Sequence, residues 1–72
     1  MGAIDLSRFK VIYDEHVYKA VAITGMQFSE GEESLIKKPK IIEVMVINED
    51  SHIILINDES WRFQFIPIVE KQ

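Results

Sequence analysis

The chain is rich in β-branched aliphatic residues and poor in the aliphatic residues that favour helices. It contains 12 Ile and 6 Val, but only 3 Leu and 3 Ala, among its 72 residues. Isoleucine and valine have stiff side chains that fit a pleated sheet, whereas leucine and alanine are better suited to a helix. The composition therefore predicts an all-β protein and argues against a helical bundle.

The length of the chain predicts a single small domain that spans residues 1–72. A chain of this size buries only about 60% of the surface that it exposes when unfolded, so its stability is marginal. It has no cysteine, which excludes disulfides and cysteine-based zinc sites as supplements to the core. Stability must come from apolar burial, and 47% hydrophobic residues supply enough for a globular core.

Turn-forming segments divide the chain into five candidate strands. They cover residues 8–13, 17–28, 41–47 and 52–56, and a fifth strand begins at Trp61. The second candidate is long enough to bend, and Gly25 within it marks a bulge or corner. Pro67 interrupts the last strand, because proline has no N–H group to donate. This pattern predicts a small five-stranded antiparallel barrel, SH3-like or OB-like.

The register of the central hairpin decides which side chains share a face. A two- or four-residue turn around Glu49 and Asp50 sets Val44 opposite Leu55. One face then collects the predicted core, namely Met45, Ile47, Ile54, Ile56, Trp61, Phe63 and Phe65. The opposite face collects Ile42, Val44, Val46, Ile53 and Leu55. In this register Glu43 falls on the core face, which indicates either a place at the rim or a bulge that shifts the pairing.

Apolar side chains on both faces of one hairpin predict a partner. An antiparallel sheet normally buries one face and exposes the other to water, and no helix is expected here that would cover the second. We therefore expect a homodimer or a protein partner to bind the second face, through the residues Ile42, Val44, Val46, Ile53 and Leu55. The alternative is a three-residue turn, which shifts one strand and merges the two apolar sets.

The sequence offers little for catalysis or for a cofactor. There is no cysteine nucleophile and no Gly-x-Ser-x-Gly elbow, and three dispersed glycines do not form a phosphate-binding loop. Glu30, Glu32 and Glu33 fall in a polar loop where a raised pKa would be hard to maintain. The sequence therefore predicts a non-catalytic interaction module without a cofactor.

The two histidines raise the question of a metal site. His16 follows Asp14 and Glu15, but these three residues are more simply a polar hairpin turn. His52 stands alone at the start of an apolar strand. We therefore predict no metal site.

Charge disfavours nucleic acid but leaves one alternative open. The net charge of −4 repels phosphate on average. The segment 29–40 nevertheless contains Lys37, Lys38 and Lys40, which could bind nucleic acid beside an exposed aromatic residue. Three glutamates precede these lysines and nearly cancel their charge, so a solvated loop is the simpler interpretation.

Aromatic residues suggest one further alternative, a peptide-binding groove. Tyr13, Tyr18 and Trp61 could line such a groove for an extended or proline-rich segment. The alternation of Trp61 with Phe63 and Phe65 favours a core role for the two phenylalanines instead.

No segment of the sequence predicts a membrane span. The longest uninterrupted apolar run is four residues, far short of the roughly 20 that cross a bilayer. The first residues lack the pattern of a secretory signal, so the cytoplasm is the expected compartment.

Overall fold

The computed structural model describes residues 3–28 and 39–69, and most of them belong to one antiparallel sheet. Its strands are β1 (Ile4–Asp5), β2 (Phe9–Tyr13), β3 (His16–Phe28), β4 (Pro39–Ile47), β5 (Ile53–Glu59) and β6 (Phe63–Pro67), and the 3-10 turn η1 (Ser60–Arg62) joins β5 to β6. The predicted all-β class is confirmed. The two-residue strand β1 was not predicted. None of the described residues forms a helix of the length and apolarity that crossing a membrane requires.

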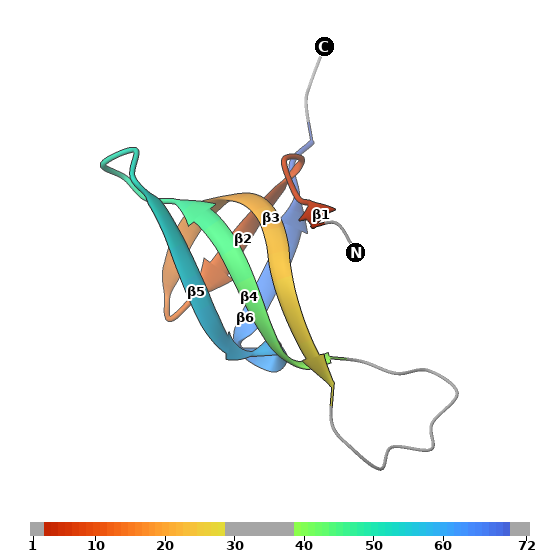
Figure 1. Ribbon diagram of the computed structural model, residues 1–72. Coiled ribbons are helices and arrows are strands. Elements are labelled where there is room, and N and C mark those ends of the chain that lie inside the picture. Colours follow the sequence, from red (N-terminus) through yellow and green to blue (C-terminus); the bar gives the residue numbers. More distant parts are fainter. Residues whose placement is uncertain (1–2, 29–38, 70–72) are drawn as a thin grey trace.

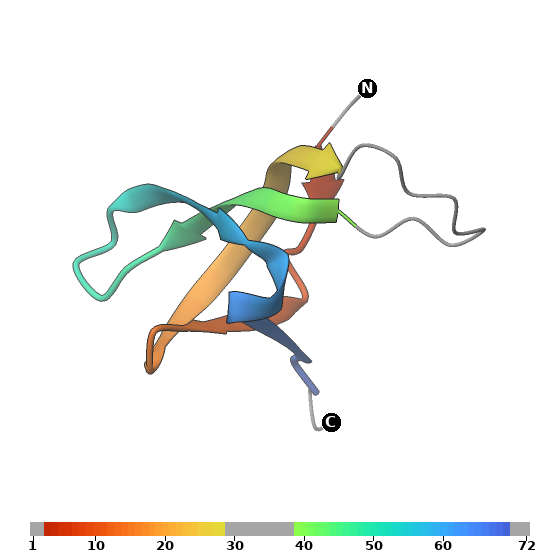
Figure 2. The same ribbon diagram turned by 90° about the horizontal axis from the view of Figure 1, so that it is seen from below.

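The sheet curls over on itself without closing. The strand order is β5-β4-β3-β2-β6, and β1 adds to β3. Figures 1 and 2 show β2 and β6 on one side of the curled sheet and β4 and β5 on the other, while the long strand β3 passes from one side to the other. Within the described residues, β5 and β6 are the two ends of this order, with no pairing between them. The predicted closed barrel is therefore not confirmed.

The long strand β3 produces the bend. Its pairing with β4 shifts register between Ala20 and Ala22, between Ile23 and Gly25, and again before Phe28. At the first two shifts the extra residue lies in β3, where it bends the strand and increases its twist, whereas at the third shift it is Lys40 of β4. The predicted bulge at Gly25 is confirmed. A Cβ atom at Gly25 would lie 3.5 Å from the Cβ of Glu43, an ordinary contact, so the bend comes from the extra residue and not from the missing side chain.

The core fills the space inside the curl. Phe63 is buried in this core, with its ring centroid 4.8 Å from that of Tyr13 and 6.2 Å from that of Phe65. The buried residues come from β2, β3, β4, β6 and the segment after β1: Leu6, Val11, Ala20, Ile42, Val44, Val46 and Phe63. Of the predicted core, Ile54, Ile56, Phe63 and Phe65 belong to or pack against this cluster. Trp61 does not, because it lies on η1 with 71% of its surface exposed.

The register of the β4–β5 hairpin differs from the prediction by one residue. Val44 lies opposite Ile56 and Val46 opposite Ile54. The alternating side chains of β4 are therefore reversed with respect to the prediction. Ile42, Val44 and Val46 point into the core at 3%, 0% and 0% exposure, so their predicted place on the outer face is wrong. Glu43, Met45 and Ile47 are on the outer side instead.

A three-residue loop causes this difference. The N–H of Asn48 donates to the carbonyl of His52 and the N–H of Ser51 donates to that of Asn48, each at 3.0 Å. The side-chain oxygen of Asn48 also accepts from the N–H groups of Asp50 and His52, both at 2.9 Å. Ser51 has a φ of 64°, the left-handed conformation that ends such loops. The loop therefore has the three residues of the alternative, but the two apolar sets do not merge, because Met45, Ile47, Ile53 and Leu55 remain outside the core.

Candidate functional site

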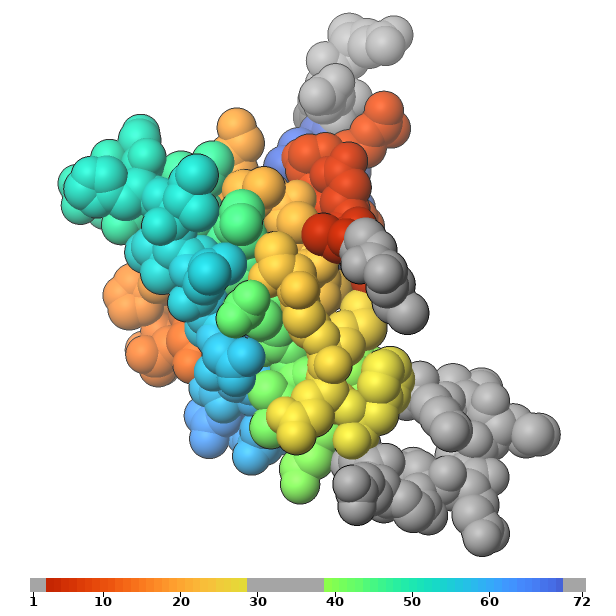
Figure 3. Space-filling model, in the orientation of Figure 1, coloured from red at the N-terminus to blue at the C-terminus, as the bar shows by residue number. Residues whose placement is uncertain are grey.

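The outer face of the β4–β5 hairpin presents apolar side chains at the end next to the 49–51 loop. Met45 lies directly opposite Leu55, and Ile47 opposite Ile53. Leu55 is 53% exposed and Ile53 is 66% exposed, while Met45 and Ile47 are half-buried. Directly opposed side chains in a sheet are close enough to contact. We call these four residues the outer patch. In Figure 3, the strands β4 and β5 that carry it face the viewer.

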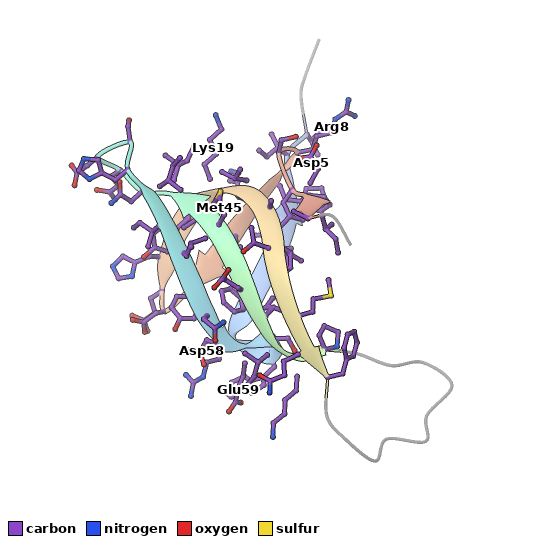
Figure 4. All side chains as sticks on the ribbon, viewed as in Figure 1. Asp5, Arg8, Lys19, Met45, Asp58 and Glu59 are labelled. Atoms are coloured by element: carbon purple, nitrogen blue, oxygen red, sulfur yellow. The ribbon has the colours of Figure 1, made fainter. Side chains whose placement is uncertain are left out.

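Polar residues limit the outer patch toward the other end of the hairpin. There Glu43 lies opposite Asn57, and Ile41 opposite Glu59. The hydroxyl of Thr24 donates to a carboxylate oxygen of Glu43 at 2.7 Å. Figure 4 shows the same polarity, with Asp58 and Glu59 at one end of the hairpin and Met45 toward the other. The outer patch is therefore a compact area and not a continuous apolar face.

The structure exposes two of the five residues that the sequence predicted for partner binding. Ile53 and Leu55 lie at the surface, whereas Ile42, Val44 and Val46 are inside the subunit. Sequence reasoning missed Met45 and Ile47, which it assigned to the core. The misfit of Glu43 was the signal that could have found them. A shift of β4 by one residue moves that carboxylate out of the core and brings Met45 and Ile47 to the outer face.

Among the described residues, no strand pairs with the edge of β5 that faces away from β4. The hydrogen bond between Asn48 N–H and the His52 carbonyl shows that the backbone groups of His52 point toward β4. Because this direction alternates along a strand, the N–H and C=O groups of Ile53, Leu55 and Asn57 point the other way. We call this side the free edge. Neither lysine nor proline protects it, since β5 reads Ile-Ile-Leu-Ile-Asn-Asp-Glu.

A polar cluster ties the far end of β5 to β2. The hydroxyl of Tyr13 donates to Asp58 Oδ2 at 2.5 Å, and the N–H of Glu59 donates to Asp58 Oδ1 at 2.7 Å. Arg62 Nε lies 3.5 Å from the same Oδ1 atom. The hydrogen bonds from Tyr13 and from the Glu59 N–H lower the pKa of Asp58. The same Tyr13–Asp58 hydrogen bond raises the pKa of Tyr13. The cluster holds β5 against β2 where no strand pairing does so.

A shallow hollow of about 300 Å³ lies between the two hairpin loops. Its lining includes His16, Tyr18, Glu49, Asp50 and Ile54. The rings of His16 and Tyr18 are 6.2 Å apart, and Nδ1 of His16 lies 2.7 Å from the carbonyl oxygen of Asp14. In the part of the chain that the structure describes, no three His, Asp or Glu side chains come together as a possible metal site.

The remaining predicted residues are dispersed. Lys37 and Lys38 lie outside the described residues, and Lys40 is exposed near the start of β4. The nucleic-acid alternative therefore stays a prediction. For the predicted peptide groove, Tyr13 and Tyr18 pack against the core, whereas Trp61 is exposed. The indole ring of Trp61 lies 4.7 Å from the guanidinium carbon of Arg62, and its N–H donates to Glu59.

Comparisons of the chain with protein-family models, with curated proteins and with solved structures found no match. The function proposed below therefore rests on the arrangement of residues in this chain.

Proposed function

We propose that this protein is a non-catalytic interaction module that self-associates through its outer patch. The observation that carries the proposal is the exposure of Ile53 and Leu55 beside the half-buried Ile47 and Met45. Contiguous exposed apolar side chains on a small domain are characteristic of a surface that binds another protein. At about 25 cal/mol per Å², covering two such side chains in each subunit contributes several kcal/mol.

The shape of the sheet supports a small-barrel architecture of the SH3-like or OB-like kind as part of this proposal. A bent central strand, a short 3-10 turn and a last strand that returns to β2 are features that bring a sheet close to closure. The remaining gap leaves β5 as an edge strand. A closed barrel has no free strand edges, whereas an open one has an edge strand that can pair with a partner.

Sedimentation equilibrium of the full chain tests the proposal. We expect the wild type to associate reversibly between about 10 µM and 1 mM, a range typical of a small apolar interface. Leu55→Lys should remain monomeric because it places a charge in the outer patch. Gln64→Lys is the matched control, since Gln64 is exposed on β6, away from the patch, and should associate as the wild type does.

Two results would count against self-association. One is a wild type that stays monomeric up to about 1 mM. The other is a Leu55→Lys variant that associates as strongly as the wild type while circular dichroism shows both to be folded. Binding to a different protein alone would give the first result.

A further inference from the structure

The free edge of β5 restricts how a second copy can pair with it. β5 ends the strand order of the sheet, and the backbone groups of Ile53, Leu55 and Asn57 point outward. Strand pairing needs edge-facing residues on both sides, because only these have free N–H and C=O groups. Two antiparallel copies of β5 can therefore pair only in registers that set Ile53, Leu55 or Asn57 opposite one another or opposite Glu59. The symmetric registers that satisfy this and overlap at least three residues of β5 outside its acidic end are centred on Ile54, Leu55, Ile56 or Asn57.

Charge separates these four registers. A pair centred on Ile54 brings Asp58 and Glu59 of one copy toward Asp50 and Glu49 in the loop of the other. The approach of like charges destabilises such a pair. A pair centred on Ile56 sets Glu59 opposite Ile53, and a pair centred on Asn57 sets Glu59 opposite Leu55, so each places a carboxylate against an apolar side chain. These three registers are disfavoured.

The register centred on Leu55 has neither defect. It sets Leu55 opposite Leu55, Ile54 opposite Ile56, and Ile53 opposite Asn57. The acidic end of each strand then meets the loop end of the other, where Asp58 lies opposite His52 and Glu59 opposite Ser51. No like charges face each other along the pair. The two exposed leucines, each 53% exposed in the single subunit, meet at the centre.

We propose that two copies of this protein pair along the free edge of β5, antiparallel and centred on Leu55. This inference rests on the proposed self-association and specifies its geometry. The sheets of the two subunits join into one, in the order β4-β5-β5-β4 at the junction, and the two outer patches become adjacent. Because the same edge is used by both copies, the assembly closes as a dimer with twofold symmetry.

Cysteine crosslinking tests the register directly, and the absence of native cysteine gives a clean background. In the proposed dimer, the two Leu55 Cα atoms are about 5.5 Å apart, within the range of a disulfide. The two Ile53 Cα atoms are more than about 12 Å apart, beyond that range. Under mild oxidation, Leu55→Cys should therefore form a covalent dimer at least about tenfold faster than Ile53→Cys. Ile53→Cys is a stringent control because Ile53 is the more exposed residue, at 66%.

A mixing experiment provides the second arm. Ile53→Cys and Asn57→Cys should each crosslink slowly alone and rapidly when mixed, because Ile53 faces Asn57 across the pair. All three positions are exposed, so the variants should fold, and circular dichroism checks this.

The outcomes separate the geometry from the self-association on which it rests. If the wild type associates but Leu55→Cys crosslinks no faster than Ile53→Cys, the Leu55-centred pair is wrong and the proposed function stands. If sedimentation instead gives species heavier than a dimer, β5 pairs with a different edge and the twofold geometry is wrong. A wild type that is monomeric throughout removes both proposals.

Discussion

The two faces of the β4–β5 hairpin carry the same kind of aliphatic residue but have different surroundings. On the inner face, Val44 and Val46 are fully buried in the core cluster. On the outer face, Ile53 and Leu55 remain more than half exposed beside Met45. Hydrophobicity alone does not distinguish the two faces. The length of the loop decides which set is buried, because one residue more or less exchanges the faces of a strand.

Charged substitutions should give the largest difference in folding stability between the two faces. Val44→Asp places an unpaired carboxylate in a fully buried position, at a cost of several kcal/mol, comparable to the whole stability of a small domain. We therefore expect it to be unfolded, whereas Leu55→Asp should stay folded. Circular dichroism and urea unfolding measure both. A folded Val44→Asp variant would show that Val44 does not point into the core.

Truncations should give a graded version of the same contrast. Val46→Ala removes two buried methyl groups and leaves a cavity, so we expect a loss of about 2 kcal/mol in the free energy of unfolding. Met45→Ala, in the next position of the same strand, should lose less than about 1 kcal/mol because Met45 is only half-buried. Urea titration compares them, and equal losses would contradict the assignment of faces.

Removing the Asn48 side chain tests why the loop has three residues. Asn48→Ala deletes the acceptor for the N–H groups of Asp50 and His52. We expect the free energy of unfolding to fall by about 1 kcal/mol, the usual net contribution of a hydrogen bond within a protein. Asn57→Ala, on the exposed side of β5, is the control and should change stability little. Chemical shifts of β4 and β5 would show whether the register also changes. An Asn48→Ala variant as stable as Asn57→Ala would indicate that the backbone alone sets the loop.

Acid should weaken the contact that holds β5 against β2. The hydrogen bond from Tyr13 keeps the pKa of Asp58 below its ordinary value, so this contribution is present above that value and is lost as the pH falls through the lowered pKa. Tyr13→Phe removes this bond and should reduce the dependence of stability on pH between about 5 and 2. Some dependence should remain, because the backbone N–H of Ser7 lowers the pKa of Asp5 in the same direction. Urea midpoints across this range measure both proteins, and an unchanged slope in Tyr13→Phe would rule out the contact as its source.

The smallest expected effect concerns the other hairpin. The β2–β3 loop has two residues, Asp14 and Glu15, with φ values of 51° and 65°. Glutamate is strained in this conformation, whereas glycine adopts it freely. Glu15→Gly should therefore stabilise the protein by about 0.5 to 1 kcal/mol. A thermal melt measures the change, and destabilisation would mean that the Glu15 side chain makes a contribution of its own.

Sequence patterns predicted those parts of the fold that depend on local alternation. The all-β class, the bulge at Gly25 and the inward direction of Phe63 and Phe65 follow from residue type and spacing. Trp61 was misassigned because η1 interrupts the alternation just before β6 begins. The strand β1 was missed because two residues are too few to alternate.

The outer patch was predicted in principle but with some wrong members. Every residue from Asn48 to Ser51 favours a turn, so loops of two, three or four residues fit the sequence equally well. The choice among them comes from hydrogen bonds that Asn48 makes after the chain has turned, which composition does not reveal. The exposure of Ile53 and Leu55 was predicted correctly, because both alternatives leave β5 with the same exposed side.

The return of β6 to β2 affects the order in which the molecule can assemble. Each of β2, β3 and β4 pairs with the next strand in sequence, whereas β6 pairs with β2, where Phe9 lies opposite Pro67. Bringing such distant segments together costs more chain entropy than forming a hairpin, and it slows folding. During synthesis, Phe63 and Phe65 are among the last core residues to leave the ribosome. Until they emerge, the core around Val44 and Val46 lacks two of its aromatic side chains, so the domain completes its folding only after its last strand has been translated.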